Sequence, residues 1–306
     1  MTEELKKVFG FMVPSMEGVE DYVPLVKDRD IEMQVCKELD VPYFLITADI
    51  FNEQDSEMQI MKPKFINLGG RVHIMKQSVE SLEGYNLLSR LWPAYVSRAL
   101  EAITQIGGKN ELTFENFQQT GNWPRYVESR FLNRKLGIVT ASQLESAVGE
   151  YAVNGMVFVK TKTKLLSEKP VIASVDELTN VLENGLPSRR LDIGKKVYKK
   201  VEPVTELILS EPISIAKNER GNFCEYRFWV VNDSVIWGYD YEIQEDVMDF
   251  AHDFVNTHKG KIPKHLVFDI AKTVDRGNVL IEVNDFMCSG STNQNLFKKI
   301  IEAYVK

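Results

Sequence analysis

The first part of the chain alternates short apolar runs with a segment whose apolar residues recur at helical spacing. Residues 8–13 and 42–50 are predicted strands, and residues 30–39 form a predicted helix between them. Residues 84–106 have a mainly helical pattern, which Pro93 should kink or restart. A β-α-β-α order of this kind is typical of an α/β domain with a largely parallel sheet.

The pattern changes near residue 125. Residues 109–135 look irregular, with a turn predicted at 120–124. Beyond them, runs of β-branched and aromatic residues follow each other closely enough to form antiparallel hairpins. The predicted strands are residues 156–160, 206–215, 225–231, 234–242, 265–274 and 278–285, and the predicted helices are residues 174–184, 245–259 and 293–306. We therefore expect an α/β region followed by an α+β region.

Composition and charge exclude several classes of protein. Of the 306 residues, 44% are hydrophobic and 26% are charged, and the net charge of −7 argues against a protein that coats nucleic acid. Three cysteines lie far apart without a C-x-x-C pair, which argues against a disulfide scaffold and a structural zinc site. No apolar run approaches the roughly 20 residues that span a bilayer, and the start has no signal-peptide pattern. We expect a soluble, cytoplasmic protein without a membrane partner.

The hairpin predicted from the last two strands carries the strongest chemical pattern. We place a tight turn between Asp275 and Asn278. This register puts Asp269 directly across from Asn284, with Glu282 two residues along on the same face. The opposite, apolar face carries Phe268, Ile270, Ile281 and Val283. Two carboxylates and a carboxamide are the oxygen ligands that suit Mg²⁺ bound to nucleotide phosphates. A solvated face of an ordinary hairpin explains the same residues, and the pattern alone leaves both interpretations open.

Two further strands carry single basic candidates. In EYRFWVV, the forked guanidinium of Arg227 suits a phosphate, although a cross-strand ion pair is the simpler interpretation. In GMVFVKTKTK, Lys160 ends an apolar strand and can present its ammonium to a phosphate, with Lys162 beside it. Solvated lysines on an edge strand are the simpler interpretation there. Taken singly, neither segment indicates a phosphate site.

Two more segments give weak signals. The strand ending at Ser210 and Glu211 breaks at Pro212, which frees backbone groups that could pair with an adenine edge, or which simply ends the strand. Residues 187–200 are densely basic in an acidic protein. They could steer an anionic substrate or close over a triphosphate, but a solvated loop or helix face is the better single interpretation.

The order of these signals is more informative than any one of them. It runs from a strand with lysine, through a broken strand with glutamate, an E-x-R hairpin and an aspartate strand, to E-x-N followed by S-G. In this order the chain resembles the ATP-grasp superfamily over about residues 130–306, most closely the small stand-alone ATP-grasp proteins of phages and bacteria. The segments that carry the resemblance are VFVKTKTK, LILSEPISI, EYRFWVV, VFDIAKTV and LIEVNDFMCSG.

The resemblance implies an ATP-grasp fold of α+β class, in which two subdomains hold ATP between them, preceded by an α/β N-terminal domain. The implied regions are residues 1–125, 126–205 and 206–306, the last with the metal site. The implied cofactors are ATP and Mg²⁺. The implied nucleotide-binding residues are Lys160, Lys162, Arg130, Ser210, Glu211, Ile213 and Arg227, of which Lys160 and Arg227 are also catalytic. The implied metal ligands are Asp269, Glu282 and Asn284. Arg134 is the alternative to Arg130.

The implied activity is that of an ATP-dependent ligase. ATP would phosphorylate the carboxylate of a small molecule or a peptide, and an amine or another nucleophile would displace phosphate from the acyl phosphate. Three alternatives remain open: a kinase with the same site, a nucleotide-binding protein without ligase activity, and an ATP-dependent enzyme that modifies nucleic acid. The sequence identifies neither the carboxylate nor the acceptor.

Overall fold

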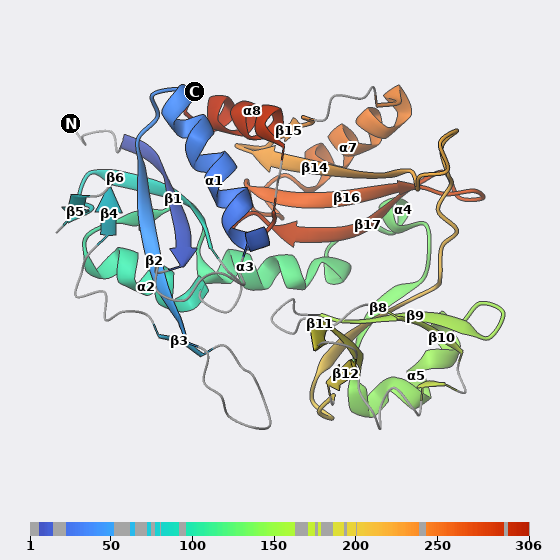
Figure 1. Cartoon of the computed structure of the whole chain (residues 1–306). Coiled ribbons are helices and arrows are strands. Elements are labelled where there is room, and N and C mark those ends of the chain that lie inside the picture. Colours follow the sequence, from blue (N-terminus) through green and yellow to red (C-terminus); the bar gives the residue numbers. More distant parts are fainter. Residues whose placement is uncertain are drawn as a thin grey trace.

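The computed structural model describes residues 6–14, 23–51, 62–64, 72–74, 77–79, 81–91, 96–162, 171–174, 177–178, 186–192, 195–199, 201–238, 243–290 and 293–305. These residues form an N-terminal sheet, a small sheet, a two-stranded hairpin and a C-terminal sheet (Figure 1). None of the helices among them has the length and apolar character to cross a membrane.

The N-terminal sheet is built around parallel strands. Its strands are β1 (Lys6–Pro14), β2 (Tyr43–Phe51), β3 (Lys62–Lys64), β4 (Val72–Ile74), β5 (Gln77–Val79), β6 (Tyr85–Arg90) and β7 (Lys109–Asn110), in the order β5-β4-β2-β1-β6-β7 with β3 beside β2. β2, β1, β6 and β7 run parallel, and α1 (Val23–Glu38) and α2 (Val96–Gln105) form the crossovers that parallel pairing requires. The expected α/β region is confirmed.

The single helix predicted for residues 84–106 is wrong over its first part. Tyr85–Arg90 form β6, which pairs with both β1 and β7, and the helix begins only at Val96. Leu87 and Leu88, which favour a helix locally, lie opposite strand residues of β1 instead. Pairing with two neighbouring strands and burial in the sheet override the local preference.

The small sheet is antiparallel and has its own core. Its strands are β8 (Leu136–Thr140), β9 (Met156–Thr161), β10 (Val171–Ser174) and β13 (Glu206–Ser210), in the order β10-β9-β13-β8. The 3₁₀ turn η3 (Ala141–Gln143) and helix α5 (Leu144–Tyr151) pack against it through Leu144 and Val148. The predicted strand 206–215 thus ends early, at Ser210, just before the predicted break.

The basic stretch 187–200 lies mostly in a hairpin rather than in a loop or a helix. β11 (Leu186–Asp192) and β12 (Lys195–Lys199) pair antiparallel, separately from the other sheets. Residues 193–194 and 200 are outside the described residues, and so is most of the predicted helix 174–184. The predicted loop or helix is therefore wrong for the described part of the basic stretch.

The C-terminal sheet presents two different faces. Its strands are β14 (Glu225–Val231), β15 (Ser234–Ile236), β16 (Leu266–Lys272) and β17 (Asn278–Asp285), in the order β15-β14-β16-β17. One face packs on helix α7 (Glu245–His258) through Phe228 and Phe268. The other face divides along the strands, because Trp229 and Val267 belong to the core of the N-terminal sheet, whereas Arg227 and Asp269 carry charge.

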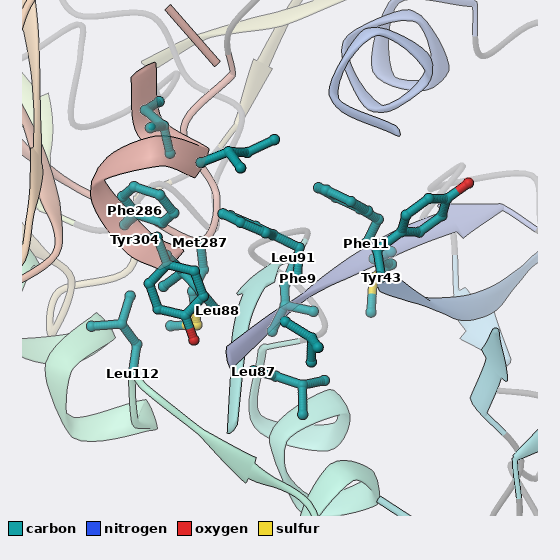
Figure 2. Packing of buried hydrophobic residues seen from close by; sticks show 14 of the residues in the cluster. Phe9, Phe11, Tyr43, Leu87, Leu88, Leu91, Leu112, Phe286, Met287 and Tyr304 are labelled. Atoms are coloured by element: carbon teal, nitrogen blue, oxygen red, sulfur yellow. The ribbon is translucent and has the colours of Figure 1, made fainter. Parts of the chain in front are cut away.

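Helix α8 (Gln294–Val305) closes the core of the N-terminal sheet. Its Phe297 and Tyr304 contact the ring of Phe9 on β1, with centroid distances of 5.5 and 5.1 Å. Figure 2 shows this packing, with Phe286 and Met287 of the segment after β17 in the same cluster. The N-terminal and C-terminal sheets therefore share one hydrophobic core.

A helical segment covers the outer edge of β17. It consists of α3 (Phe114–Gly121), the 3₁₀ turn η2 (Trp123–Arg125) and α4 (Ser129–Leu132), and both α3 and α4 contact β17. Figure 1 shows α3 running beneath β17, on the side where the small sheet lies. The predicted irregularity of residues 109–135 is wrong here. Thr113 begins α3 with a capping box that includes Asn116, a residue type outside the usual glutamate or glutamine pattern.

Candidate nucleotide and metal site

The hairpin of β16 and β17 has a different register from the predicted one. Asp269 pairs with Glu282, so the predicted pairing of Asp269 with Asn284 is wrong. The loop between the strands is longer than a two-residue turn, since the last ladder pair before it joins Lys272 to Asn278. Such a loop changes which residues face each other along the whole hairpin.

A β-bulge beside the Asp269–Glu282 pair restores the predicted faces. With the longer loop alone, Asp269 would pair with Ile281, and Glu282 would turn toward the core. The ladder instead shifts by one residue at this point, which leaves Ile281 without a ladder partner. Glu282 and Asn284 therefore share the charged face with Asp269, as predicted, although for a different reason.

Arg227 and Asp269 form a two-pronged ion pair across β14 and β16. Arg227 Nε and Nη2 donate to the two carboxylate oxygens of Asp269 at 2.7 and 2.8 Å. Asn284 Nδ2 donates to the same carboxylate at 3.1 Å. The side chain of Asp269 is 3% exposed and that of Arg227 is 35% exposed, so solvent reaches only the guanidinium.

The amide oxygen of Asn284 is available as a ligand. Asn284 is 2% exposed, and its Oδ1 has no hydrogen-bond partner among the described residues. The amide cannot be turned round, because Oδ1 would then face the carboxylate of Asp269 instead of Nδ2. A buried oxygen without a donor is costly unless a cation or water meets it. Together with Asp269 and Glu282, it fits Mg²⁺, which prefers oxygen ligands.

Lys160 brings the small sheet to this face. It lies on β9, and its Nζ is 2.7 Å from Oε1 of Glu282 on β17. Both side chains are largely buried, at 17% and 21% exposure. Lys162, two residues along the same strand, contacts Glu206, which also pairs with Arg125 at 3.0 Å. The two predicted lysines thus lie on the side of β9 that faces the C-terminal sheet.

A pocket of about 390 Å³ opens between these elements. It is lined by Phe114, Phe117, Gln118, Thr120, Gly121, Asn122, Trp123, Lys160, Lys162, Glu206, Glu282, Val283, Asn284 and Asp285. One wall is the helical segment of α3 and η2, and the others come from β9, β13 and β17. Its volume lies in the range of small-molecule sites. The pocket therefore joins predicted phosphate and metal residues to a wall from outside the predicted motifs.

A family model decides the classification. The model of an ATP-grasp domain, family 3 of its clade, matches residues 119–303, more than half of the chain. The chain belongs to this ATP-grasp family. Membership places it among the ATP-dependent ligases of ATP-grasp type, and it confirms the predicted resemblance and fold class. A comparison with curated proteins found no match.

Solved structures share the fold across the whole ATP-grasp domain and the region before it. D-cycloserine synthetase DcsG aligns with a TM-score of 0.56 at 11% identity, covering 98% of this chain and 100% of its own. The ADP complex of purK, N5-carboxyaminoimidazole ribonucleotide synthetase, aligns with a TM-score of 0.57 at 13% identity, covering 100% and 79%. D-alanyl-alanine synthetase A from Vibrio cholerae gives 0.52 at 11%, covering 96% and 93%. Identities this low show the fold alone.

The junction of the two sheets in the ATP-grasp domain lies at the end of β13. Glu211 N donates to Lys135 O at 3.0 Å, and Arg276 Nη1 holds the carboxylate of Glu211 at 2.7 Å. Ser210 is 2% exposed, and its hydroxyl accepts from Arg134 Nε at 2.8 Å. The predicted adenine-binding segment is thus fixed in place by its side chains, and the half-buried Ile213 belongs to the same segment.

Arg130 is not brought together with the other predicted residues of the ATP-grasp domain. Its guanidinium is exposed and binds Asp253 and Thr257 on α7, with Nη2 at 3.1 and 2.7 Å. These carboxylate and hydroxyl contacts raise the pKa of Arg130. Arg134, the alternative, is the arginine that reaches Ser210.

Sequence reasoning missed two acidic residues near the site. Asp285 lines the pocket and is 7% exposed, and its Oδ1 accepts from Cys288 N at 2.7 Å. Glu225 lies on the face of Arg227, and its pKa is raised, first by desolvation and then by Asp269 and Glu282. The pattern E-x-N-D marked Asp285, but only the structure shows that it reaches the pocket.

The metal site relies on the amide as well as the carboxylates. Over the described ranges, no three His, Cys, Asp or Glu side chains are grouped to hold a metal ion. The predicted set contains two carboxylates, and its third member, Asn284, is the one with the unpartnered buried oxygen. The fit to Mg²⁺ therefore depends on Asn284.

Proposed function

We propose that the chain is an ATP- and Mg²⁺-dependent ligase that joins a carboxylate to an amine or another nucleophile through an acyl phosphate. The observation that carries the proposal is the convergence of Lys160, Glu282 and Asn284 on one pocket, with Arg227 and Asp269 directly behind them on the same sheet face. Membership in the ATP-grasp family and the fold shared with synthetases support it.

The basic residues would stabilise the phosphates. Lys160 and Lys162 project from β9 toward the pocket, where their ammonium groups suit phosphate oxygens as point charges. Arg227 offers a planar fork on the sheet face and is held in orientation by Asp269. The backbone from Ser210 and Glu211 to Ile213 would meet the adenine edge. Arg130 is left out of this set because its guanidinium is held on α7.

Asp269, Glu282 and Asn284 would hold Mg²⁺ through their oxygens. When bound, the ion would neutralise charge on the transferred phosphoryl group. Asp269 accepts three hydrogen bonds, and a carboxylate offers about four lone pairs, so it can still serve as a ligand. Glu282 accepts from Lys160, so the same carboxylate links the lysine and the metal set.

The proposed chemistry needs positioning and electrostatic stabilisation more than proton transfer. A carboxylate oxygen of the substrate attacks the γ-phosphorus, and ADP leaves. The acceptor nitrogen or oxygen then attacks the acyl carbon, phosphate leaves, and the acceptor proton passes to solvent or a nearby base. Lys160 and Arg227 would stabilise the charge that develops on the phosphoryl oxygens.

Thermal unfolding tests the nucleotide site before any substrate is known. MgATP at 100-fold excess over Kd should stabilise the folded protein by roughly 2.7 kcal/mol. The shift should require Mg²⁺ and should be lost in Asp269→Asn and Glu282→Gln. Asp253→Asn is the matched control, since this carboxylate lies on α7 away from the pocket. A wild-type protein without any shift would contradict the proposal.

Positional isotope exchange then tests the ligase step. Carboxylates are screened with ATP labelled at the bridging oxygen between the β- and γ-phosphorus atoms. A carboxylate that forms an acyl phosphate should cause scrambling without any acceptor, and release of ADP and phosphate should follow when the acceptor is added. Stable transfer of phosphate to an alcohol would instead identify a kinase, and binding without turnover would identify a nucleotide-binding protein.

A further inference from the structure

The position of Glu282 depends on the bulge in β17. The ladder before the bulge pairs Ile270 with Leu280, and a regular ladder would next pair Asp269 with Ile281. Side chains alternate between the two faces of a strand, so a shift of one residue would move Glu282 from the charged face to the core face. The bulge is therefore what places Glu282 within reach of Lys160.

Arg134 binds the backbone of this bulge. Its Nη1 donates to the carbonyl oxygen of Leu280 at 2.8 Å, and its Nη2 lies 3.4 Å from that of Ile281. Its other donors reach the small sheet and α4, with Nε at 2.8 Å from Ser210 Oγ and Nη1 at 3.0 Å from Leu132 O. One guanidinium thus connects the bulge to the end of β13.

These contacts occupy an open edge. β17 is the outer strand of its sheet, so carbonyl groups that point away from β16 have no ladder partner. No carboxylate neutralises Arg134 through a direct hydrogen bond among its described contacts; its partners are three carbonyls and a hydroxyl. Burial and the nearby Arg276 lower the pKa of Arg134 to about 10. A guanidinium is held in this position by neutral backbone acceptors, at an electrostatic cost.

We propose that Arg134 is a positioning residue, which holds the bulge at Ile281 so that Glu282 stays on the face of Asp269 and Lys160. The proposal rests on the proposed function for its link to metal and nucleotide binding. Arg134 would act through the backbone of β17 and would touch neither the metal nor the nucleotide. Supporting residues around a metal site typically change metal affinity about 10- to 100-fold.

Deletion of Ile281 gives a specific test of this role. Without Ile281, a regular ladder pairs Leu280 with Ile270 and Glu282 with Asp269, which are the pairs already present. The deletion therefore removes the need for a bulge without changing the face of Glu282. If Arg134 acts by holding the bulge, it should become dispensable in the deletion variant. If Arg134 contacts the nucleotide directly, it should remain necessary.

The experiment measures Mn²⁺ affinity in the presence of ADP for the whole chain. Arg134→Met should weaken it about 10- to 100-fold. Arg276→Met is the matched control, because Arg276 belongs to the same junction but contacts Asn133 O and Glu211 rather than the bulge. In the background of the Ile281 deletion, Arg134→Met should have no further effect. An unchanged affinity in Arg134→Met alone, or an undiminished loss in the deletion background, would overturn the proposal.

Hydrogen exchange keeps the proposal testable if the deletion variant does not fold or if the wild type binds no Mn²⁺. Arg134→Met should accelerate exchange of the backbone amides over residues 280–284, while β14 and the Arg276→Met control keep their protection over the same range. Unchanged protection would overturn the positioning role. A wild type without Mn²⁺ or nucleotide binding, but with this exchange pattern, would contradict only the proposed function.

Discussion

Two arginine–carboxylate pairs of this protein differ in what surrounds them. Arg90 on β6 binds Glu32 on α1 with Nε at 3.2 Å and Nη2 at 3.0 Å, and both side chains are fully buried. It also donates to the carbonyls of Phe286 and Ser289 and lies 4.8 Å over the ring of Trp229. Arg227 binds Asp269 with similar distances, but one third of its side chain meets solvent.

The difference separates a structural pair from a site. Arg90 has buried partners on α1, on the C-terminal sheet and on the segment after β17, so its charge is committed to joining these elements. Arg227 keeps an exposed side on the sheet face next to Glu282, so a ligand could share its charge. Similar ion-pair geometry therefore gives different functions according to solvent access.

The largest effect should come from Arg90. Arg90→Met leaves Glu32 with less compensation in a fully buried place, and breaking a buried pair typically costs about 3–5 kcal/mol. Urea unfolding should show this loss, while the folded variant keeps its MgATP shift. A loss of the shift at a temperature where the variant is folded would remove the distinction from Arg227.

Glu111 should give the next effect, through pH. Lying near His265 at 3.9 Å and paired with Lys264 at 2.6 Å, it has its pKa lowered from 4.5 to about 2. Lys264 is the stronger partner, because 3.9 Å exceeds hydrogen-bond distance. A lowered folded-state pKa gives stability that is present above pH 4.5 and lost as the pH falls toward 2, at most about 3 kcal/mol.

The measurement for Glu111 compares unfolding free energies of wild type and Glu111→Gln across pH. The difference should be constant above pH 5 and should shrink below pH 4.5. A difference that grows at acid pH would contradict the assignment. Because Glu111 also accepts from Asn86 Nδ2 at 2.6 Å, this pair joins the N-terminal sheet to the strand before the site, as Arg90 does.

Arg227→Met should change stability less and binding more. Water can reach the open side of Asp269 once the partly exposed guanidinium is gone, so we expect a loss of about 1–2 kcal/mol. The MgATP midpoint shift should fall strongly, because Asp269 loses its orientation and the phosphate loses a forked donor. An unchanged shift would return Arg227 to the simple cross-strand pair.

Arg130 should have the smallest effect. Arg130→Met removes an exposed pair with Asp253, and such pairs contribute about 0–1 kcal/mol. Unfolding midpoint and MgATP shift should stay close to wild type. A lost shift would restore Arg130 to the nucleotide site and would show that its contacts on α7 are exchanged when ligand binds.

The sequence predicted the residues of the site better than their contacts. Period-two alternation placed Asp269, Glu282 and Asn284 on one face because alternation is local. The loop length was misjudged by three residues of register and the bulge restored one, so the face survived by an even net shift. A bulge is stabilised by a distant residue, Arg134, and no local pattern contains that information.

The parts that could not be predicted depend on long-range packing. Residues 85–90 form a strand because β1 and β7 lie on either side, not because of their own pattern. Arg90 gave no signal, since its partners are far away along the chain. The wall of α3 was missed because its capping residue Asn116 is unusual, and its role as a pocket wall follows only from its place beside β17.

The shared core has a consequence for biosynthesis. Phe9 leaves the ribosome early, but its ring contacts come from Phe297 and Tyr304 on α8. The N-terminal sheet therefore cannot bury this face until most of the chain has been translated. Contacts so distant in sequence slow folding, and the exposed aromatic surface of the growing chain has to be protected from aggregation in the meantime.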